Sequence, residues 1–338
     1  MLALRARRRI YATGLLLALL AVRPTGAATD PAPALQLLVF GSADCLACEA
    51  TADALAADAG WQQAVQRLPT RALDVDGDGR ALAARYRIGR LPTSLLVNAD
   101  GEELGRVAGA QTPATFTAAL NGWRRTRSTA RARSARAVEI THEGAAALAE
   151  TLARYHASND GDGGFAWWLR LPIAVRGQQG SASPEVLHWR NRIEFLQAAQ
   201  RHNPLQADAG GHKVLEDPRV GCDRGIELAR YLDSTRSLDP ARRRASLQAF
   251  RADAEAALAR DAFAEPPGCV DSLPLVLATA DLLAALGEPE AERQLLARAI
   301  AHCQQRIAGG AARDRRSAPL QLAQLRARLA SRAPPQAS

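Results

Sequence analysis

Residues 35–59 read LQLLVFGSADCLACEATADALAADA, and this stretch decides how the N-terminal part of the chain folds. Its first six residues are mostly apolar and predict a short buried strand, whereas the alanine-rich stretch from Cys45 predicts a helix to about Ala59. Cys45 and Cys48 therefore stand where a strand turns into a helix. Unpaired backbone N–H groups and the helix dipole stabilise a thiolate at such a helix N-terminus. We expect Cys45 to be the attacking thiol and Cys48, one turn later, the resolving thiol.

The sequence that follows alternates between strand and helix patterns. Short apolar runs are separated by turn residues, and a threonine followed by proline provides a helix start with an N-cap. This alternation predicts an α/β domain over residues 34–123. The expected elements after the first helix are strands at 70–75, 93–97 and 102–107 and helices at 81–86 and 112–123.

A second motif, Ile88-Gly89-Arg90-Leu91-Pro92-Thr93, comes immediately before the strand expected at residue 93. With the C-x-x-C pair at a strand–helix junction, Asp74-Val75-Asp76 and Asp100-Gly101, it makes residues 34–123 resemble the thioredoxin superfamily. In that family the proline is cis and packs against the active-site sulfurs, and the residue before it presents its backbone to an extended substrate.

The resemblance implies a thiol-disulfide oxidoreductase that acts on protein thiols or disulfides and exchanges electrons with a redox partner. It implies catalytic roles for Cys45, Cys48 and Pro92, and it places Leu91 and Thr93 at the substrate. No cofactor beyond the cysteine pair is expected.

Several positions depart from the usual thioredoxin pattern, among them Leu46-Ala47 in place of Gly-Pro. Asp44 stands where a tryptophan usually precedes the first cysteine, Val39 replaces a buried acid, and Glu49 follows the second cysteine. Two acidic neighbours oppose the helix dipole and disfavour the thiolate, so they make the disulfide form relatively more favourable. This electrostatic argument predicts a reductant or carrier in place of a strong oxidant.

Two functions of other classes remain open. A thioredoxin fold kept only as a binding scaffold would make the protein a non-catalytic envelope adaptor. Two thiolates also satisfy copper(I), whereas zinc usually takes four ligands, so a copper(I) carrier is the stronger metal alternative.

No resident metal site is expected elsewhere. Residues 74–79 imitate the start of a calcium loop, but Arg85 occupies the position that requires a bidentate glutamate. The six histidines lack the H-E-x-x-H spacing of zinc hydrolases. We expect His142, His156 and His302 on helix surfaces.

The N-terminus has the composition of a secretory leader. Basic residues precede an apolar run at 10–22, and small residues follow at 26–28. The apolar run is shorter than the roughly 20 residues that span a bilayer. The pattern predicts a signal peptide over residues 1–28, export to the periplasm, and no stable membrane span after cleavage.

The net charge of +8 does not indicate nucleic-acid binding, because the chain is expected to be exported and no basic run is interleaved with aromatic residues. Residues 124–138 are rich in arginine and lack large apolar residues, which predicts a linker. The alternative for this segment is a patch for anionic lipid headgroups.

From residue 139 to 330 the hydrophobic period becomes helical, which predicts a mostly α-helical domain. Helices are expected at 144–156 and 184–202, and the aromatic cluster at 165–169 is interpreted as a packing centre. From residue 221 four helices are expected at 221–238, 239–260, 268–286 and 289–307, as a weak repeat of two helical hairpins that faintly resembles tetratricopeptide repeats. The alternative is two unrelated helical hairpins.

Three further cysteines occur in the helical part. Cys222 and Cys269 open the first helices of the two expected hairpins, so stacking of the hairpins in parallel register would bring them within disulfide range. An oxidising compartment would preserve such a structural disulfide. Cys303 would then be a buried free thiol; the alternative is that all three are isolated core cysteines.

Overall fold

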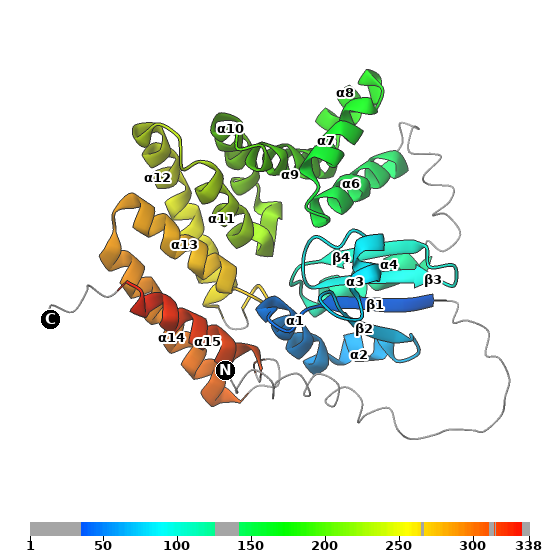
Figure 1. Cartoon of the computed structure of the whole chain (residues 1–338), viewed down its shortest axis with the longest axis horizontal. Coiled ribbons are helices and arrows are strands. Elements are labelled where there is room, and N and C mark those ends of the chain that lie inside the picture. Colours follow the sequence, from blue (N-terminus) through cyan, green and yellow to red (C-terminus); the bar gives the residue numbers. More distant parts are fainter. Residues whose placement is uncertain (1–34, 126–141, 265–266, 311–313, 315, 333–338) are drawn as a thin grey trace. The chain divides into compact units, whose positions relative to one another are not determined.

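Four strands form one mixed sheet at the start of the region that the computed structural model describes, residues 35–125, 142–264, 267–310, 314 and 316–332 (Figure 1). The sheet order is β2-β1-β3-β4. β1 pairs in parallel with β2 and antiparallel with β3, and β4 pairs antiparallel with β3. The strands are β1 (Leu35–Gly41), β2 (Thr70–Asp74), β3 (Thr93–Asn98) and β4 (Glu103–Ala108).

Helices cover both faces of this sheet, which explains why β1 is apolar on both sides. Leu37 packs with Trp61, Phe116 and Leu120 on one face, whereas Leu38 and Phe40 pack with Tyr86 on the other. Successive residues of a strand point to opposite faces, so a strand buried on both sides reads as a continuous apolar run. The helices are α1 (Leu46–Ala57), α2 (Ala59–Val65), α3 (Arg80–Arg85) and α4 (Pro113–Arg125).

The helix expected from Cys45 to Ala59 ends at Ala57, and a second helix starts directly after it. Asp58 has an extended backbone and caps the second helix, because its Oδ1 accepts the backbone N–H of Trp61 at 2.6 Å. A side-chain acceptor at an N-cap satisfies a backbone donor that the helix itself leaves unpaired. The new helix places Trp61 in the core beside Phe116.

The rest of the described chain is helical. Its helices are α6 (His142–Ala157), α7 (Gly161–Arg170), α8 (Ile173–Ala182), α9 (Pro184–Gln200), α10 (Pro204–Leu215), α11 (Arg224–Ser234), α12 (Pro240–Ala257), α13 (Leu273–Leu286), α14 (Pro289–Gly309) and α15 (Ser317–Ala330). A mixed sheet with helices followed by a mostly helical region is the fold class that the sequence predicts, and it is confirmed.

Two of the expected helix starts lie further along the chain than predicted. Residues Pro218–Asp223 form a 3-10 helix that is interrupted at Gly221, whose φ is +52°, so α11 begins only at Arg224. Likewise α13 begins at Leu273, not at Gly268. Cys222 and Cys269 therefore precede these helices and do not occupy their first turns.

Within the helical region, Trp168 is buried with Leu148, Leu152 and Ile193, whereas Leu169 of the same aromatic cluster is 48% exposed. In the described ranges no helix has the length and apolar character required to cross a bilayer. The expected signal peptide lies outside the described residues, as does the expected linker apart from residues 124 and 125, where α4 ends.

Candidate active site

The Cys45–Cys48 pair lies at the N-terminus of α1. Cys45 is the N-cap of the helix, and its Sγ accepts the backbone N–H of Cys48 at 3.0 Å. The two cysteines are joined in a disulfide with their Cα atoms 5.2 Å apart. Because the cap donor points at Cys45 Sγ, the same N–H is positioned to stabilise a thiolate there after reduction.

Gly41, the last residue of β1, lies directly against the second cysteine. A Cβ added at Gly41 would be 3.3 Å from Cys48 Sγ, which is tighter than most contacts of a real Cβ. The strand end is therefore one wall of the space that holds the resolving sulfur.

Strand pairing brings Pro92 to the same end of the sheet. Phe40 pairs with Thr93 across β1 and β3, so Pro92 lies beside Gly41, which abuts Cys48. The Leu91–Pro92 peptide bond is cis, and the Pro92 carbonyl accepts the backbone N–H of Gly109 at 2.7 Å.

Leu91 is partly buried, and Thr93 is only 1% exposed. The Thr93 hydroxyl donates to the backbone carbonyl of Arg90 at 2.6 Å. The Thr93 side chain therefore serves to fix the loop, and the residue as a whole offers almost no surface to a substrate.

The two acidic neighbours of the pair have different surroundings. Asp44 is exposed. Glu49 is buried, and its Oε2 lies 3.4 Å from Nε of Arg316, which also lies 2.9 Å from Oδ1 of Asp53. Arg316, which precedes α15 and is distant in sequence, thus shares its one positive charge between Glu49 and Asp53.

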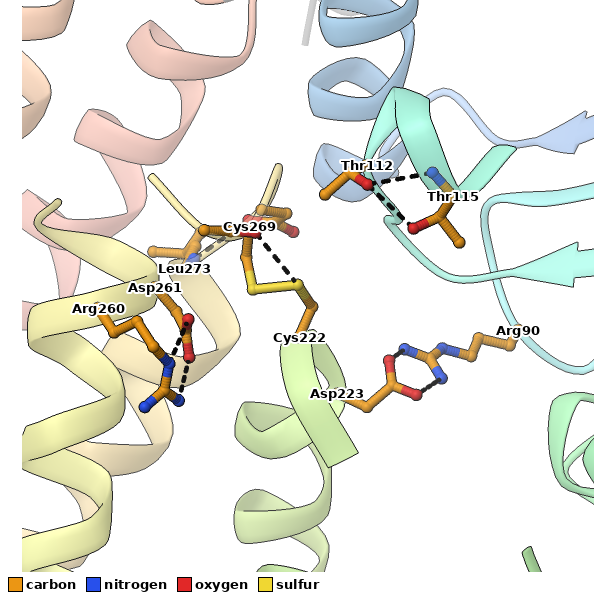
Figure 2. Close-up of a disulfide and its surroundings, with 11 residues drawn as sticks. Arg90, Thr112, Thr115, Cys222, Asp223, Arg260, Asp261, Cys269 and Leu273 are labelled. Carbon is orange, nitrogen blue, oxygen red and sulfur yellow. Dashed lines mark hydrogen bonds and ion pairs between the residues drawn. A yellow bond between two sulfur atoms is a disulfide. The ribbon is translucent and has the colours of Figure 1, made fainter. Parts of the chain in front are cut away.

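A second arginine connects the loop before Pro92 to the helical region. Arg90 donates from Nη1 to Oδ2 of Asp223 at 3.0 Å and from Nη2 to Oδ1, a bidentate pair drawn in Figure 2. Oδ2 of Asp223 also accepts from Arg192 at 2.7 Å. Burial by itself would raise the pKa of Asp223, but Arg90 and Arg192 outweigh burial and hold the pKa well below its usual range.

Arg192 continues this buried cluster of charges. It donates to Oε1 of Glu227 at 2.7 Å, and Nε2 of His156 lies 2.9 Å from the same oxygen. Burial, assisted by Arg192, lowers the pKa of His156 to about 4, whereas Arg230 and Arg192 hold the pKa of Glu227 well below its usual range despite burial. The prediction that His156 lies on a helix surface is wrong, because Trp189 and the Arg192–Glu227 ion pair lie beside its ring in the protein interior.

Cys222 and Cys269 are joined in a disulfide with their Cα atoms 5.5 Å apart (Figure 2). Cys222 is partly exposed, and Cys269 is 5% exposed. The pair lines a cavity of about 530 Å³. Cys303 is a buried free thiol, and burial raises its pKa.

Sequence reasoning missed Arg90, Asp223 and Arg316 as neighbours of the site. Arg90 stands inside the motif around Pro92, and Asp223 directly follows Cys222, so each adjoins a residue that the sequence did single out. No local pattern pairs them, because they are separated by 133 residues along the chain. Across the described ranges, no group of three or more His, Cys, Asp or Glu side chains is placed to hold a metal ion.

Comparison with known proteins agrees with the geometry of the site. Residues 29–122 match the family model described as a thioredoxin-like domain. Neither a curated protein nor a solved structure matches the chain. The domain and its Cys45–Cys48 pair fit a thiol-disulfide oxidoreductase. The chain thus contains a thioredoxin-like domain at residues 29–122, followed by a largely helical region.

Proposed function

We propose that the protein is an exported thiol-disulfide oxidoreductase of the periplasm, with Cys45 as the attacking thiol and Cys48 as the resolving thiol. The observation that carries the proposal is the hydrogen bond from the Cys48 N–H to Cys45 Sγ at the start of α1. In this reaction the Cys45 thiolate attacks a protein disulfide, and Cys48 then attacks Cys45 in the mixed disulfide. The client leaves as a dithiol, and Cys45 and Cys48 form a disulfide.

Pro92 and Leu91 would hold the client chain next to the sulfurs. The position of Pro92 beside Gly41 supports this role, since Gly41 contacts Cys48. An extended client segment would then run past Leu91, the partly exposed residue of this loop, with backbone hydrogen bonds as the main contacts.

We further propose that the pair acts as a reductant or carrier. Asp44 supports this direction, because its exposed carboxylate opposes a thiolate at Cys45. Glu49 supports it less than the sequence suggests, because Arg316, which is shared with Asp53, offsets part of its charge. Equilibration with glutathione tests the direction: a potential near that of thioredoxin, roughly −270 mV, agrees with it, whereas roughly −120 mV, the value of a strong periplasmic oxidant, contradicts it.

Insulin reduction by dithiothreitol tests the activity itself. The wild-type protein should accelerate precipitation of the insulin chains, and Cys45→Ser should return the rate to that without protein. Cys303→Ala is the matched control, because this cysteine is buried in the helical core and takes no part in the exchange. Equal rates for the wild type and Cys45→Ser would contradict the proposal.

The intermediate and the export step have their own measurements. Cys48→Ser should accumulate a mixed disulfide with insulin through Cys45, detected by peptide mapping. N-terminal sequencing of periplasmic protein should find a start after Ala27 or Ala28. A folded protein that leaves insulin intact would favour the adaptor function, and copper bound after anaerobic purification would favour a copper(I) carrier.

A further inference from the structure

Two contacts connect the helical region that carries the Cys222–Cys269 disulfide to the loop and helix that form the candidate active site. The first is the bidentate pair between Arg90 and Asp223 (Figure 2). Asp223 directly follows Cys222, and Arg90 is two residues before Pro92. Consecutive Cα atoms are about 3.8 Å apart, so each end of this ion pair lies within one or two residues of Cys222 or Pro92.

The second contact comes from the C-x-x-C motif itself. Leu46, between the two cysteines, packs against a cluster of the helical region that includes Leu273 and Leu275 at the start of α13. Leu273 follows Cys269 by four residues. One half of the second disulfide is thus tied to the Pro92 loop by an ion pair, and the other half precedes a helix of the cluster against which Leu46 packs.

The second disulfide is also open to attack. Cys222 is partly exposed, and both cysteines line the cavity of about 530 Å³, so an incoming thiol is not blocked by the protein core. Ionised side chains of both signs make this cavity polar; they are Glu216, Asp253 and Asp261 together with Arg224 and Arg260. Exposed disulfides are more readily reduced than shielded ones.

We propose that Cys222–Cys269 is a second redox-active pair, which exchanges electrons with Cys45 and Cys48 of the same chain. This inference rests on the proposed thiol-disulfide activity and names an intramolecular partner for it. The Arg90–Asp223 pair and the packing of Leu46 hold both cysteine pairs in one compact unit, so exchange between them is intramolecular.

The exchange balances without any further reactant. The Cys45 thiolate attacks Cys222 Sγ, the more exposed sulfur, which forms a Cys45–Cys222 bond and releases the Cys269 thiolate. The Cys48 thiolate then attacks Cys45 Sγ, which closes the Cys45–Cys48 disulfide and releases the Cys222 thiolate. Two electrons pass from the first pair to the second, and the two protons lost by Cys45 and Cys48 are taken up by Cys222 and Cys269.

The test follows both disulfides of the full-length protein during reduction by dithiothreitol. Samples are quenched with acid, alkylated and mapped by mass spectrometry. In the wild type, Cys45 and Cys48 should be labelled first, and Cys222 and Cys269 should follow at a rate that does not depend on protein concentration. In Cys45→Ser, labelling of Cys222 and Cys269 should be slower by about tenfold or more, because only direct attack by dithiothreitol remains.

A trapping experiment identifies the sulfur that is attacked. The variant Cys48→Ala with Cys269→Ala keeps Cys45 and Cys222, and mild oxidation should give a Cys45–Cys222 cross-linked peptide within one chain. The matched control, Cys48→Ala with Cys222→Ala, keeps Cys45 and Cys269 and should give less cross-link, because Cys269 is buried.

The outcomes separate this inference from the proposed function. Insulin reduction by the wild type, together with equal labelling rates of Cys222 in the wild type and Cys45→Ser, would overturn the inference alone. Failure of Cys45 to exchange with either insulin or dithiothreitol would overturn both. Slow labelling in Cys45→Ser with a Cys45–Cys222 cross-link supports the inference whatever the result with insulin.

Discussion

Replacing Asp223 with asparagine removes the charge that holds the Pro92 loop to the helical region while keeping the shape of the side chain. The Asp223 side chain is 9% exposed and pairs with both Arg90 and Arg192. Breaking a buried ion pair by removing one partner costs about 3–5 kcal/mol. Arg192 keeps Glu227 at 2.7 Å, and the Arg90 side chain is 16% exposed and can reach water. We therefore expect the lower end of that range, a loss of about 3 kcal/mol in the free energy of unfolding.

Urea unfolding measures this loss. With a denaturant dependence of about 3 kcal/mol per molar, Asp223→Asn should lower the urea midpoint by about 1 M. Asp233→Asn on α11 is the matched control, because its ion pair with Arg236 at 3.2 Å is exposed and is expected to contribute about 0.5 kcal/mol or less. Similar midpoints for the two variants would refute the view that Asp223 is a buried anchor.

Three further predictions address other parts of the structure. His156 binds a proton near pH 6.5 in the unfolded chain but only near pH 4 in the folded protein, so the free energy of unfolding should fall by about 3 kcal/mol as the pH drops through this interval. The urea midpoint of His156→Gln should depend less steeply on pH than that of the wild type. Equal pH dependences of the two midpoints would contradict the burial of His156. The double variant Cys222→Ala/Cys269→Ala removes a cross-link between residues with a sequence separation of 47, which should lower the free energy of unfolding by about 4 kcal/mol in the chain-entropy model. A loss below about 1 kcal/mol, measured by urea unfolding, would indicate that the disulfide is not formed in the wild type. Gly89→Ala places a Cβ 2.3 Å from a backbone oxygen in the turn after α6 and should lower the free energy of unfolding by about 1–3 kcal/mol. In the control Gly177→Ala in α8, the new Cβ meets no atom within 4 Å, so this variant should be neutral or more stable by up to about 1 kcal/mol. Equal thermal midpoints of the two variants would count against the close approach at Gly89.

Local sequence signals were sufficient for the α/β part of the fold. The apolar run of β1, the turn after β3 and the Thr112-Pro113 helix start each depend on residues within one element or its cap, and each lies within a few residues of its expected place. The N-terminus of α1 also followed from the sequence, because the spacing of Cys45 and Cys48 fits one helical turn.

The helical region was predicted as a class, but its details were not. α7, α8, α10 and α15 were not expected as helices. α11 and α13 start later than expected, because Gly221 and the segment after Gly268 depart from helical backbone. Periodicity detects an apolar stripe, but it does not fix the residue at which a helix begins.

The sequence by itself placed Cys45 and Cys48 where a strand turns into a helix, because strand and helix patterns and the cap at Cys45 are local. Only the tertiary structure decided the surroundings of those residues. Arg316 lies between Glu49 and Asp53, Asp223 anchors Arg90, and His156 is buried beside Glu227. Each of these pairs joins segments far apart in the chain, and the energy of an ion pair depends on distance and burial, which no local pattern encodes.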